Sequence, residues 1–292
     1  MLSPADCAPG RQFNNGSCLR KIDLEDIIHH ADKDKDNNKK YNSNNNTLTK
    51  KDLLNKVNDI MQKYNCDDND QFCWMNTKLV KGIDKGNISL STFKPVAPKG
   101  KYNWLSTSNI NEVMIQYMNK YDDFVFYGAL PYDFDILDEL EINNINFDEL
   151  MNDGKTKIGI VVNLDNHDES GSHWVAIYSQ LDKDRIYFFD SFGKRPGKRL
   201  TKFIRYLLTF MYNKKNKTNI SLDEFLSKNH NSSDYDVRFN KKQHQFKNSE
   251  CGVYSMNFII RLLNGETFKQ IVNNITDDTT MNQCRQVYFR KR

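Results

Sequence analysis

Hydrophobic side chains recur with a helical period in the C-terminal two thirds of the chain. Apolar residues at 200, 203, 204, 207, 208 and 211 share one helix face, so residues 200–211 are predicted to form an amphipathic helix. A similar spacing predicts another helix over residues 110–118. Residues 253–263 are apolar on nearly every side, which is typical of a buried central helix.

Short runs of β-branched and aromatic residues predict strands between these helices, at 158–164, 173–179 and 185–189. The turn-like segment 180–184 separates the last two runs, so we expect a hairpin there. Residues 236–246 are compatible with a further strand. Strands followed by helices predict an α+β domain that extends from residue 101 to residue 292.

The first 93 residues have a different pattern, which predicts a helical N-terminal region. Apolar residues mark a short helix near Ile22–Ile28 and a second one over 53–61, for which Thr49 is a suitable N-cap. Between them, residues 32–46 consist almost wholly of Asp, Lys and Asn, a composition that predicts a polar loop. Residues 94–100 contain two prolines and a glycine and are predicted to form a linker.

The composition is that of a globular protein. Hydrophobic residues make up 38% of the 292 positions, and 18 Phe and 14 Tyr supply large side chains for a core, which excludes a fully disordered chain. No window approaches 18 consecutive apolar residues, so we expect no membrane span. The N-terminus lacks a basic segment followed by an apolar run, so we also expect that the protein is not secreted.

Charge is nearly balanced along the chain as a whole. There are 42 basic and 38 acidic residues, a net charge of +4 that does not by itself indicate a nucleic-acid binder. Basic residues nevertheless cluster over 194–217. We interpret this stretch as the solvated face of the amphipathic helix, with a weak nucleic-acid contact as the alternative.

The six cysteines, at positions 7, 18, 66, 73, 251 and 284, are too few for a disulfide scaffold. Without an export signal, reduced thiols in a cytosol-like compartment are the expectation. A zinc site built from the first four cysteines with His29 and His30 is the alternative. The spacings of ten and six intervening residues differ from the usual zinc knuckle, so no metal site is predicted.

Cys251 has the sequence context of a nucleophile. Polar residues precede it and the buried helix follows it, which would place its sulfur at a helix N-terminus, where an anion is favoured. Gly252 would allow another backbone or a substrate to approach closely. The alternative is a buried core cysteine that acts as a small hydrophobe.

Three more residues could complete a cysteine-based site. His173 opens one strand of the expected hairpin and Asp190 closes the other, so the carboxylate could orient the imidazole. Gln245 lies six residues before Cys251, where its amide could donate to a developing oxyanion. Taken singly, each has an ordinary structural reading, as a strand-start histidine, a turn aspartate and a solvated glutamine.

As a set, these residues resemble the Ulp1/adenain superfamily of cysteine proteases, which includes SUMO and NEDD8 proteases and core-protein proteases of large DNA viruses. The motifs that carry the resemblance are Gly171-Ser172-His173-Trp174, Phe189-Asp190-Ser191 and the segment from Gln245 to Tyr254. The order His, Asp, Gln, Cys is that of the family. The helix entry around Trp104-Leu105 is also similar, and the resemblance covers about residues 101–265.

The resemblance implies the family's fold and a role for each matching residue. Cys251 would be the nucleophile, His173 the general base and then acid, Asp190 its orienting partner and Gln245 the oxyanion donor. Trp104 and Trp174 match two tryptophans that flank a narrow substrate tunnel in the family. No metal or organic cofactor is implied.

The resemblance also implies the class of substrate. The family's Asn-Asp after Trp-Leu is Ser106-Thr107 here, and the loop 165–172 is longer than in the SUMO proteases, which favours the maturation proteases of giant viruses. We therefore expect an endopeptidase that cleaves viral precursor polyproteins after small or Gly-containing sites, in the host cytoplasm or the virion. The alternatives are an isopeptidase for ubiquitin, SUMO or NEDD8 conjugates, a clan-related acyltransferase, and a catalytically silent packing or nucleic-acid-binding protein.

Overall fold

The computed structural model describes residues 2–33, 48–83, 87–227 and 234–291. The chain divides into two compact units, of which the first contains residues 1–97 and 287–292 and the second contains residues 98–286. The boundary near residue 97 lies inside the Pro- and Gly-containing segment 94–100. The predicted polar loop 32–46 lies outside the described residues apart from residues 32 and 33, which belong to a helix.

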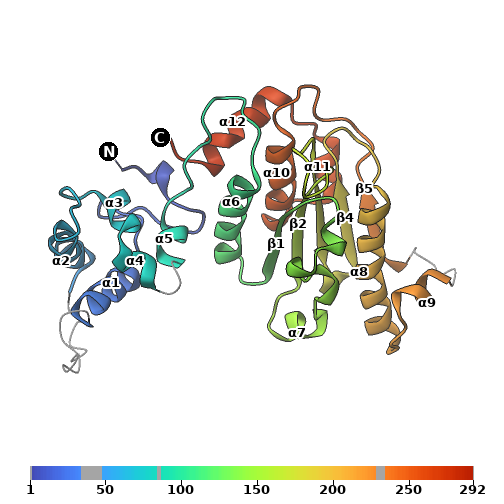
Figure 1. Ribbon diagram of the computed structural model, residues 1–292, viewed down its shortest axis with the longest axis horizontal. Helices are drawn as coiled ribbons and strands as arrows, with labels where there is room; N and C mark the ends of the chain where they lie inside the picture. Colours follow the sequence, from blue (N-terminus) through green and yellow to red (C-terminus); the bar gives the residue numbers. More distant parts are fainter. Residues whose placement is uncertain (1, 34–47, 84–86, 228–233, 292) are drawn as a thin grey trace. The chain divides into compact units, whose positions relative to one another are not determined.

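The first unit consists of short helices around an apolar core (Figure 1). They are the 3-10 helix η1 (Pro4–Asp6), α1 (Lys21–Lys33), α2 (Lys50–Gln62), α3 (Gln71–Asn76), α4 (Lys78–Gly82) and α5 (Asn87–Thr92). Helix α2 begins as expected, because the Thr49 side chain accepts a hydrogen bond from the Asp52 backbone N–H. Leu24 and Ile27 of α1 pack with Leu53 and Val57 of α2, all four fully buried.

Two disulfides fasten this small core, one between Cys7 and Cys18 and the other between Cys66 and Cys73. The expectation of reduced thiols is therefore wrong for these four residues. Cysteine density was a poor guide because these bonds reinforce a helical core rather than replace one. The zinc alternative fails as well, since the thiolates that would bind the ion are engaged with each other. Cys251 and Cys284 are the free cysteines.

The second unit contains a five-stranded mixed sheet in the order β1-β2-β3-β4-β5 (Figure 1). The strands are β1 (Phe124–Leu130), β2 (Lys157–Asn163), β3 (Trp174–Gln180), β4 (Arg185–Phe189) and β5 (Asp236–Phe239). The two outer pairs are parallel and the two inner pairs are antiparallel. The α+β class, the strands β2, β3 and β4 and the hairpin between the last two are thus confirmed.

The predicted strand at 236–246 is wrong beyond Phe239. There the chain leaves the sheet, because the Asn240 side-chain amide binds both backbone groups of Asp190. Its oxygen accepts from the Asp190 N–H at 2.9 Å, and its nitrogen donates to the Asp190 carbonyl at 2.6 Å. These two bonds replace the continuation of the strand and hold the end of β4 in place.

Helices cover both faces of the sheet. On one face, Ile158, Ile160, Val175 and Ile177 pack against α8 (Lys198–Asn216) and α7 (Phe147–Asn152). The opposite face packs on α10 (Cys251–Leu263), where Phe258 stacks on Phe189 with ring centroids 4.8 Å apart. This alternation follows from the period of two along each strand.

The remaining elements of the second unit surround this layered core. Helix α6 (Thr107–Lys120) packs against β1. The others are α9 (Leu222–Ser227), α11 (Phe268–Asn273), α12 (Asp278–Tyr288) and the 3-10 helices η4 (Phe134–Ile136), η5 (Asp138–Leu140), η6 (Ile142–Asn144) and η7 (Leu181–Lys183). The expected helices at 110–118, 200–211 and 253–263 lie within α6, α8 and α10.

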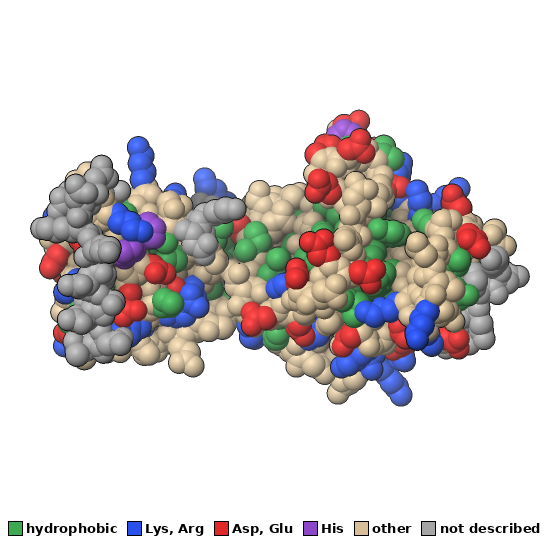
Figure 2. Space-filling model, turned by 90° about the horizontal axis from the view of Figure 1, so that it is seen from below, with side chains coloured by type: hydrophobic (Ala, Val, Ile, Leu, Met, Phe, Trp, Pro, Cys, Tyr) green, Lys and Arg blue, Asp and Glu red, His purple; other side chains and the backbone are tan. Residues whose placement is uncertain are grey.

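The basic stretch 194–217 lies mostly on α8 and on the loop before it. Arg199 forms an ion pair with Asp135, and Lys202 lies 3.9 Å from the same carboxylate. On the face of the second unit seen in Figure 2, acidic and basic side chains are interspersed. None of the helices in the described ranges is both long enough and apolar enough to cross a bilayer.

Candidate active site

The hairpin brings His173 and Asp190 together at one end of the strands β3 and β4. β3 begins directly after His173, β4 ends directly before Asp190, and the two strands are antiparallel, so these ends must meet. The His173 Nε2 atom lies 2.7 Å from the Asp190 Oδ1 atom. Both residues are buried, with 7% and 2% of their surface exposed, so this polar contact is shielded from water.

Other contacts fix the orientation of this pair. The Phe192 backbone N–H donates to Asp190 Oδ1 at 2.8 Å. The Phe192 ring stacks on the imidazole of His173, with centroids 4.5 Å apart and an angle of 21° between the planes. The imidazole is therefore held by a carboxylate at its edge and by an aromatic ring on its face.

Cys251 supplies the sulfur on the other side of the imidazole. It is the first residue of α10, is 2% exposed and has its side chain in hydrogen-bonding contact with His173. Because Nε2 faces Asp190, Nδ1 is the ring nitrogen left for the sulfur. The structure thus brings together three residues that are far apart in the sequence.

The charge of His173 follows from these neighbours. Burial alone would lower the pKa of its imidazole, but the hydrogen bonds to Asp190 and Cys251 and their negative charges raise that pKa to about 9. The ring is then protonated at neutral pH. An imidazolium beside the sulfur and the N-terminal end of the 13-residue helix α10 form the setting that is typical of a nucleophilic cysteine.

Gly252 lies where a side chain would be tightly packed. A Cβ atom at this position would come within 3.1 Å of the Leu105 Cβ and 3.3 Å of the Trp174 Cδ1. The Trp174 indole in turn donates from Nε1 to the Leu105 carbonyl at 3.0 Å. Leu105, which precedes α6, is therefore held by a hydrogen bond directly beside the start of α10.

The two tryptophans singled out in the sequence have different environments. Trp174 is buried, with 5% of its surface exposed, and is anchored through its N–H. Trp104 is 47% exposed, although it directly precedes the Leu105 that anchors Trp174. Trp174 thus serves as part of the wall behind Cys251, whereas Trp104 offers an aromatic surface to solvent.

Gln245 is buried and held from both ends of its amide. Its Oε1 accepts from the Ser191 hydroxyl at 2.7 Å, and its Nε2 donates to the Lys247 carbonyl at 2.6 Å. The Gln245 backbone N–H also donates to the Ser191 carbonyl at 3.0 Å. Since an amide nitrogen carries two N–H groups, one donor of Nε2 is not used by the Lys247 bond.

One face of α12 holds the loop between Gln245 and Cys251, and this role was not predicted. Asp278, Asn282 and Arg285 follow one another at intervals of four and three residues, so they project from the same side of the helix. The Asp278 carboxylate accepts from the backbone N–H groups of Phe246 and Lys247, at 2.8 and 3.0 Å.

The same face secures Glu250, the residue directly before Cys251. Its buried carboxylate accepts from Asn282 Nδ2 and from Arg285 Nε, each at 2.8 Å. Arg285 also donates to the Ser249 carbonyl at 3.0 Å. The polar residues at helical spacing are visible in the sequence, but nothing there identifies their partners.

Comparison with known proteins shows what this chain is similar to. Residues 151–291 match the family model described as the Ulp1 protease family, C-terminal catalytic domain. A protein of Acanthamoeba polyphaga mimivirus, a thiol protease by name, is 39% identical over 209 residues, which are 72% of this chain and 64% of that protein. The chain therefore spans less than two thirds of that relative.

Similarity also extends to African swine fever virus. The protein of its Kenya isolate that is named a SUMO-1 cysteine protease is 24% identical over 72% of this chain and 76% of its own length. A crystal structure of the protease from African swine fever virus has the same fold, with a TM-score of 0.62, 19% identity and coverage of 100% of this chain and 98% of that one. Residues 151–291 therefore form a domain of the Ulp1 protease family.

Proposed function

We propose that this protein is a cysteine endopeptidase in which Cys251 attacks the peptide carbonyl. The observation that carries the proposal is the position of His173, whose ring contacts both the Asp190 carboxylate and the Cys251 side chain. A thiolate is the reactive form of cysteine, and an imidazolium next to it stabilises that form.

The chemistry follows from this arrangement. The Cys251 sulfur bonds to the carbonyl carbon, and the carbonyl π electrons move to oxygen, where the spare N–H of Gln245 donates. His173 then gives its proton to the departing amine, and the C–N bond breaks to leave a thioester on Cys251. The imidazole next removes a proton from water, the hydroxide attacks the thioester, and the acid product leaves as the sulfur is released.

We propose a substrate that carries a small or Gly-containing cleavage site, in a viral precursor polyprotein. Two features support it: the Leu105 side chain and the Trp174 indole pack closely around Gly252, the residue next to Cys251, and the relatives come from mimivirus and African swine fever virus. A peptide-library cleavage profile of the wild type beside Cys251→Ala tests this. Cleavage after bulky residues only, or equal cleavage by the variant, would reject the proposal.

A second candidate is an isopeptidase that acts on ubiquitin-like conjugates. The African swine fever virus relative named a SUMO-1 cysteine protease favours it. The two candidates share their chemistry and differ in the partner. Fluorogenic C-terminal derivatives of ubiquitin, SUMO and NEDD8, assayed beside Gly-Gly-X peptides, distinguish them, because an isopeptidase would prefer the folded partner by a large factor in kcat/KM.

We further propose that the protein is present in the virion as well as in the host cytoplasm. The two disulfides of the first unit favour a stage in an oxidising environment, which a released particle meets. Mass spectrometry of purified particles without prior reduction would test the location and the disulfides together. A nucleic-acid contact through the basic stretch 194–217 stays a prediction.

A further inference from the structure

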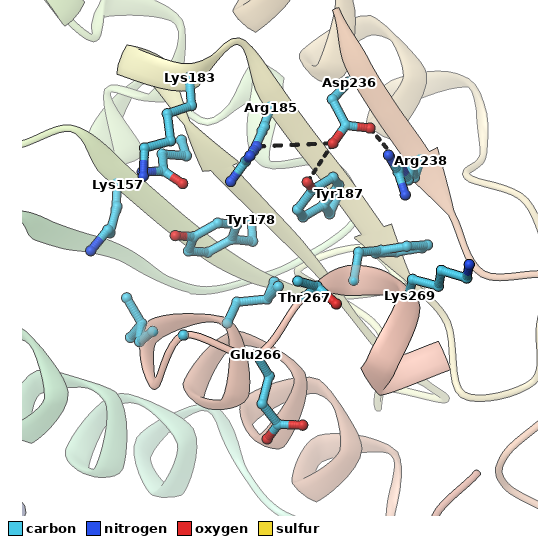
Figure 3. A pocket seen from close by; sticks show the side chains of 15 residues that line it. Lys157, Tyr178, Lys183, Arg185, Tyr187, Asp236, Arg238, Glu266, Thr267 and Lys269 are labelled. Atoms are coloured by element: carbon cyan, nitrogen blue, oxygen red, sulfur yellow. Dashed lines mark hydrogen bonds and ion pairs between the residues drawn. The ribbon is translucent and has the colours of Figure 1, made fainter. Parts of the chain in front are cut away.

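A basic pocket lies at the end of the sheet opposite to the candidate active site. It is a cavity of about 460 Å³ between the sheet and the turn that joins α10 to α11 (Figure 3). The two sites lie at opposite ends of β3 and β4. His173 and Asp190 flank these strands at one end, and Gln180 and Arg185 line the pocket at the other end. Tyr178 lies five positions after His173 along extended strand, a distance of about 17 Å.

Strand register explains why the basic side chains converge. Gln180 pairs with Lys157 and with Arg185, and Arg185 pairs with Asp236. These paired residues form one row across the sheet. Two positions further along the strands, a second row places Tyr178 beside Tyr187, and Tyr187 beside Arg238. Residues two apart on a strand share a face, so both rows belong to the face that α10 covers, beyond the end of that helix.

The charge of the pocket is strongly positive. Its cations are Lys157, Lys183, Arg185, Arg238 and Lys269, whereas its acids are Asp236 and Glu266. Both acids are engaged: Asp236 pairs with Arg238 and accepts from the Tyr187 hydroxyl at 2.6 Å, and Glu266 pairs with Arg261 at 2.7 Å. Lys157 is partly offset by Asp123, 2.7 Å away and outside the lining.

Several donors in the pocket have no partner within the part of the chain that the structure describes. Lys183 and Lys269 form no ion pair there, and the Tyr178 hydroxyl makes no hydrogen bond. Tyr178 is 97% buried, since only 3% of its surface is exposed, and its hydroxyl is directed to the side of the pocket where Lys157 and Lys183 lie (Figure 3). Burial raises the pKa of Tyr178, so the hydroxyl keeps its proton.

We infer that this pocket is a binding site for a compact oligophosphate anion, such as inorganic triphosphate or the phosphate chain of a nucleotide. Guanidinium groups present paired N–H donors that match phosphate oxygens, and ammonium groups add point charge. The volume is in the range of small-molecule sites. An acidic peptide spreads its carboxylates along an extended backbone, so it would meet these converging cations one at a time.

Titration calorimetry on the full chain tests the inference, with sodium triphosphate, ATP and uncharged adenosine as probes. Both phosphates are expected to bind more weakly as salt is raised, and adenosine is expected not to bind. Equal affinity for the two phosphates would mean that the phosphate chain alone is recognised, and tighter binding of ATP would point to a nucleotide. Absence of binding by both at millimolar concentration would overturn the site.

Variants locate the binding. Lys183→Gln combined with Lys269→Gln should weaken triphosphate binding by about tenfold or more, and Tyr178→Phe should weaken it by a smaller factor. Lys198→Gln with Lys241→Gln removes the same charge from exposed sites outside the pocket and should leave binding unchanged. Equal weakening by both double variants would refute the inference. So would a protein that binds duplex DNA or an acidic peptide but does not bind triphosphate.

Discussion

In the first unit, each disulfide joins cysteines only 11 or 7 residues apart, and an apolar core surrounds them. In the second unit, the candidate site draws on residues from Leu105 to Arg285, which are held by packing, hydrogen bonds and the Arg285–Glu250 ion pair. Local covalent bonds can reinforce the apolar core of a small helical unit. A reactive site needs buried polar groups whose partners come from distant segments, so each lost partner leaves another group unsatisfied.

The largest expected effect is the loss of the sulfur from the site. Cys251→Ala should lower kcat/KM for peptide cleavage by about 10⁵-fold or more, because no other group can form the acyl-enzyme. The free energy of unfolding should change by about 1 kcal/mol, since only a sulfur atom is removed from a buried site. Cleavage kinetics and urea denaturation measure the two quantities. Substantial residual turnover would show that the chemistry belongs to another residue.

Asp190→Asn should have the next largest effect on rate, a loss of about 10²- to 10⁴-fold in kcat. The amide cannot stabilise the charged imidazole as the carboxylate does, so the pKa of His173 should fall from its raised value. Cleavage rates across pH would detect both changes, because the alkaline limb should move to lower pH in the variant. An unchanged limb would mean that Asp190 does not control the imidazole.

Two arginine–glutamate pairs in the second unit provide a matched test of burial. Arg285→Met would leave Glu250 charged in a site where its side chain is 2% exposed, at a cost of about 3–5 kcal/mol. Arg261→Met breaks a pair whose members are 19% and 38% exposed and should cost about 1 kcal/mol or less. Urea denaturation compares the two variants. Similar losses would contradict the claim that the α12 face holds the loop before Cys251.

The smallest expected effect concerns the first unit. Replacing Cys66 and Cys73 together by Ser should destabilise it by about 2 kcal/mol, because the bond closes only a short loop. Hydrogen exchange should speed up in α2 and α3, while the amides of β3 and β4 keep their protection. Equal acceleration in the strands would show that the disulfide stabilises both units and not the first unit alone.

The sequence predicted the strands and the contacts that follow directly from the short connection between two strands. Short runs of β-branched and aromatic residues located β2, β3 and β4, and the hairpin geometry followed from them, so the contact between His173 and Asp190 could be foreseen. β1 was not predicted, and its apolar run is interrupted by Gly128, which has a φ of 117° where the register with β2 shifts between Phe126 and Ala129.

Long-range polar partners could not be read from the sequence in the same way. The Asp278, Asn282 and Arg285 face looks like the solvated side of any helix until the loop before Cys251 is placed beside it. The disulfide pairs posed a similar difficulty, since spacing alone does not show which sulfurs meet. Asn240 directly follows β5, and its side chain bonds to Asp190, which lies fifty residues away in the sequence.

The measurement that tests the central claim most directly is the alkylation rate of Cys251 as a function of pH, with Cys284 as the internal reference. Burial raises the pKa of Cys284, so its thiol should react slowly near neutrality. His173 keeps its proton until the pH passes about 9, so the advantage of Cys251 should be present near pH 7 and shrink above pH 9. His173→Ala should abolish it. Equal rates for the two cysteines in the wild type, or no change in His173→Ala, would contradict an imidazole that activates the Cys251 sulfur.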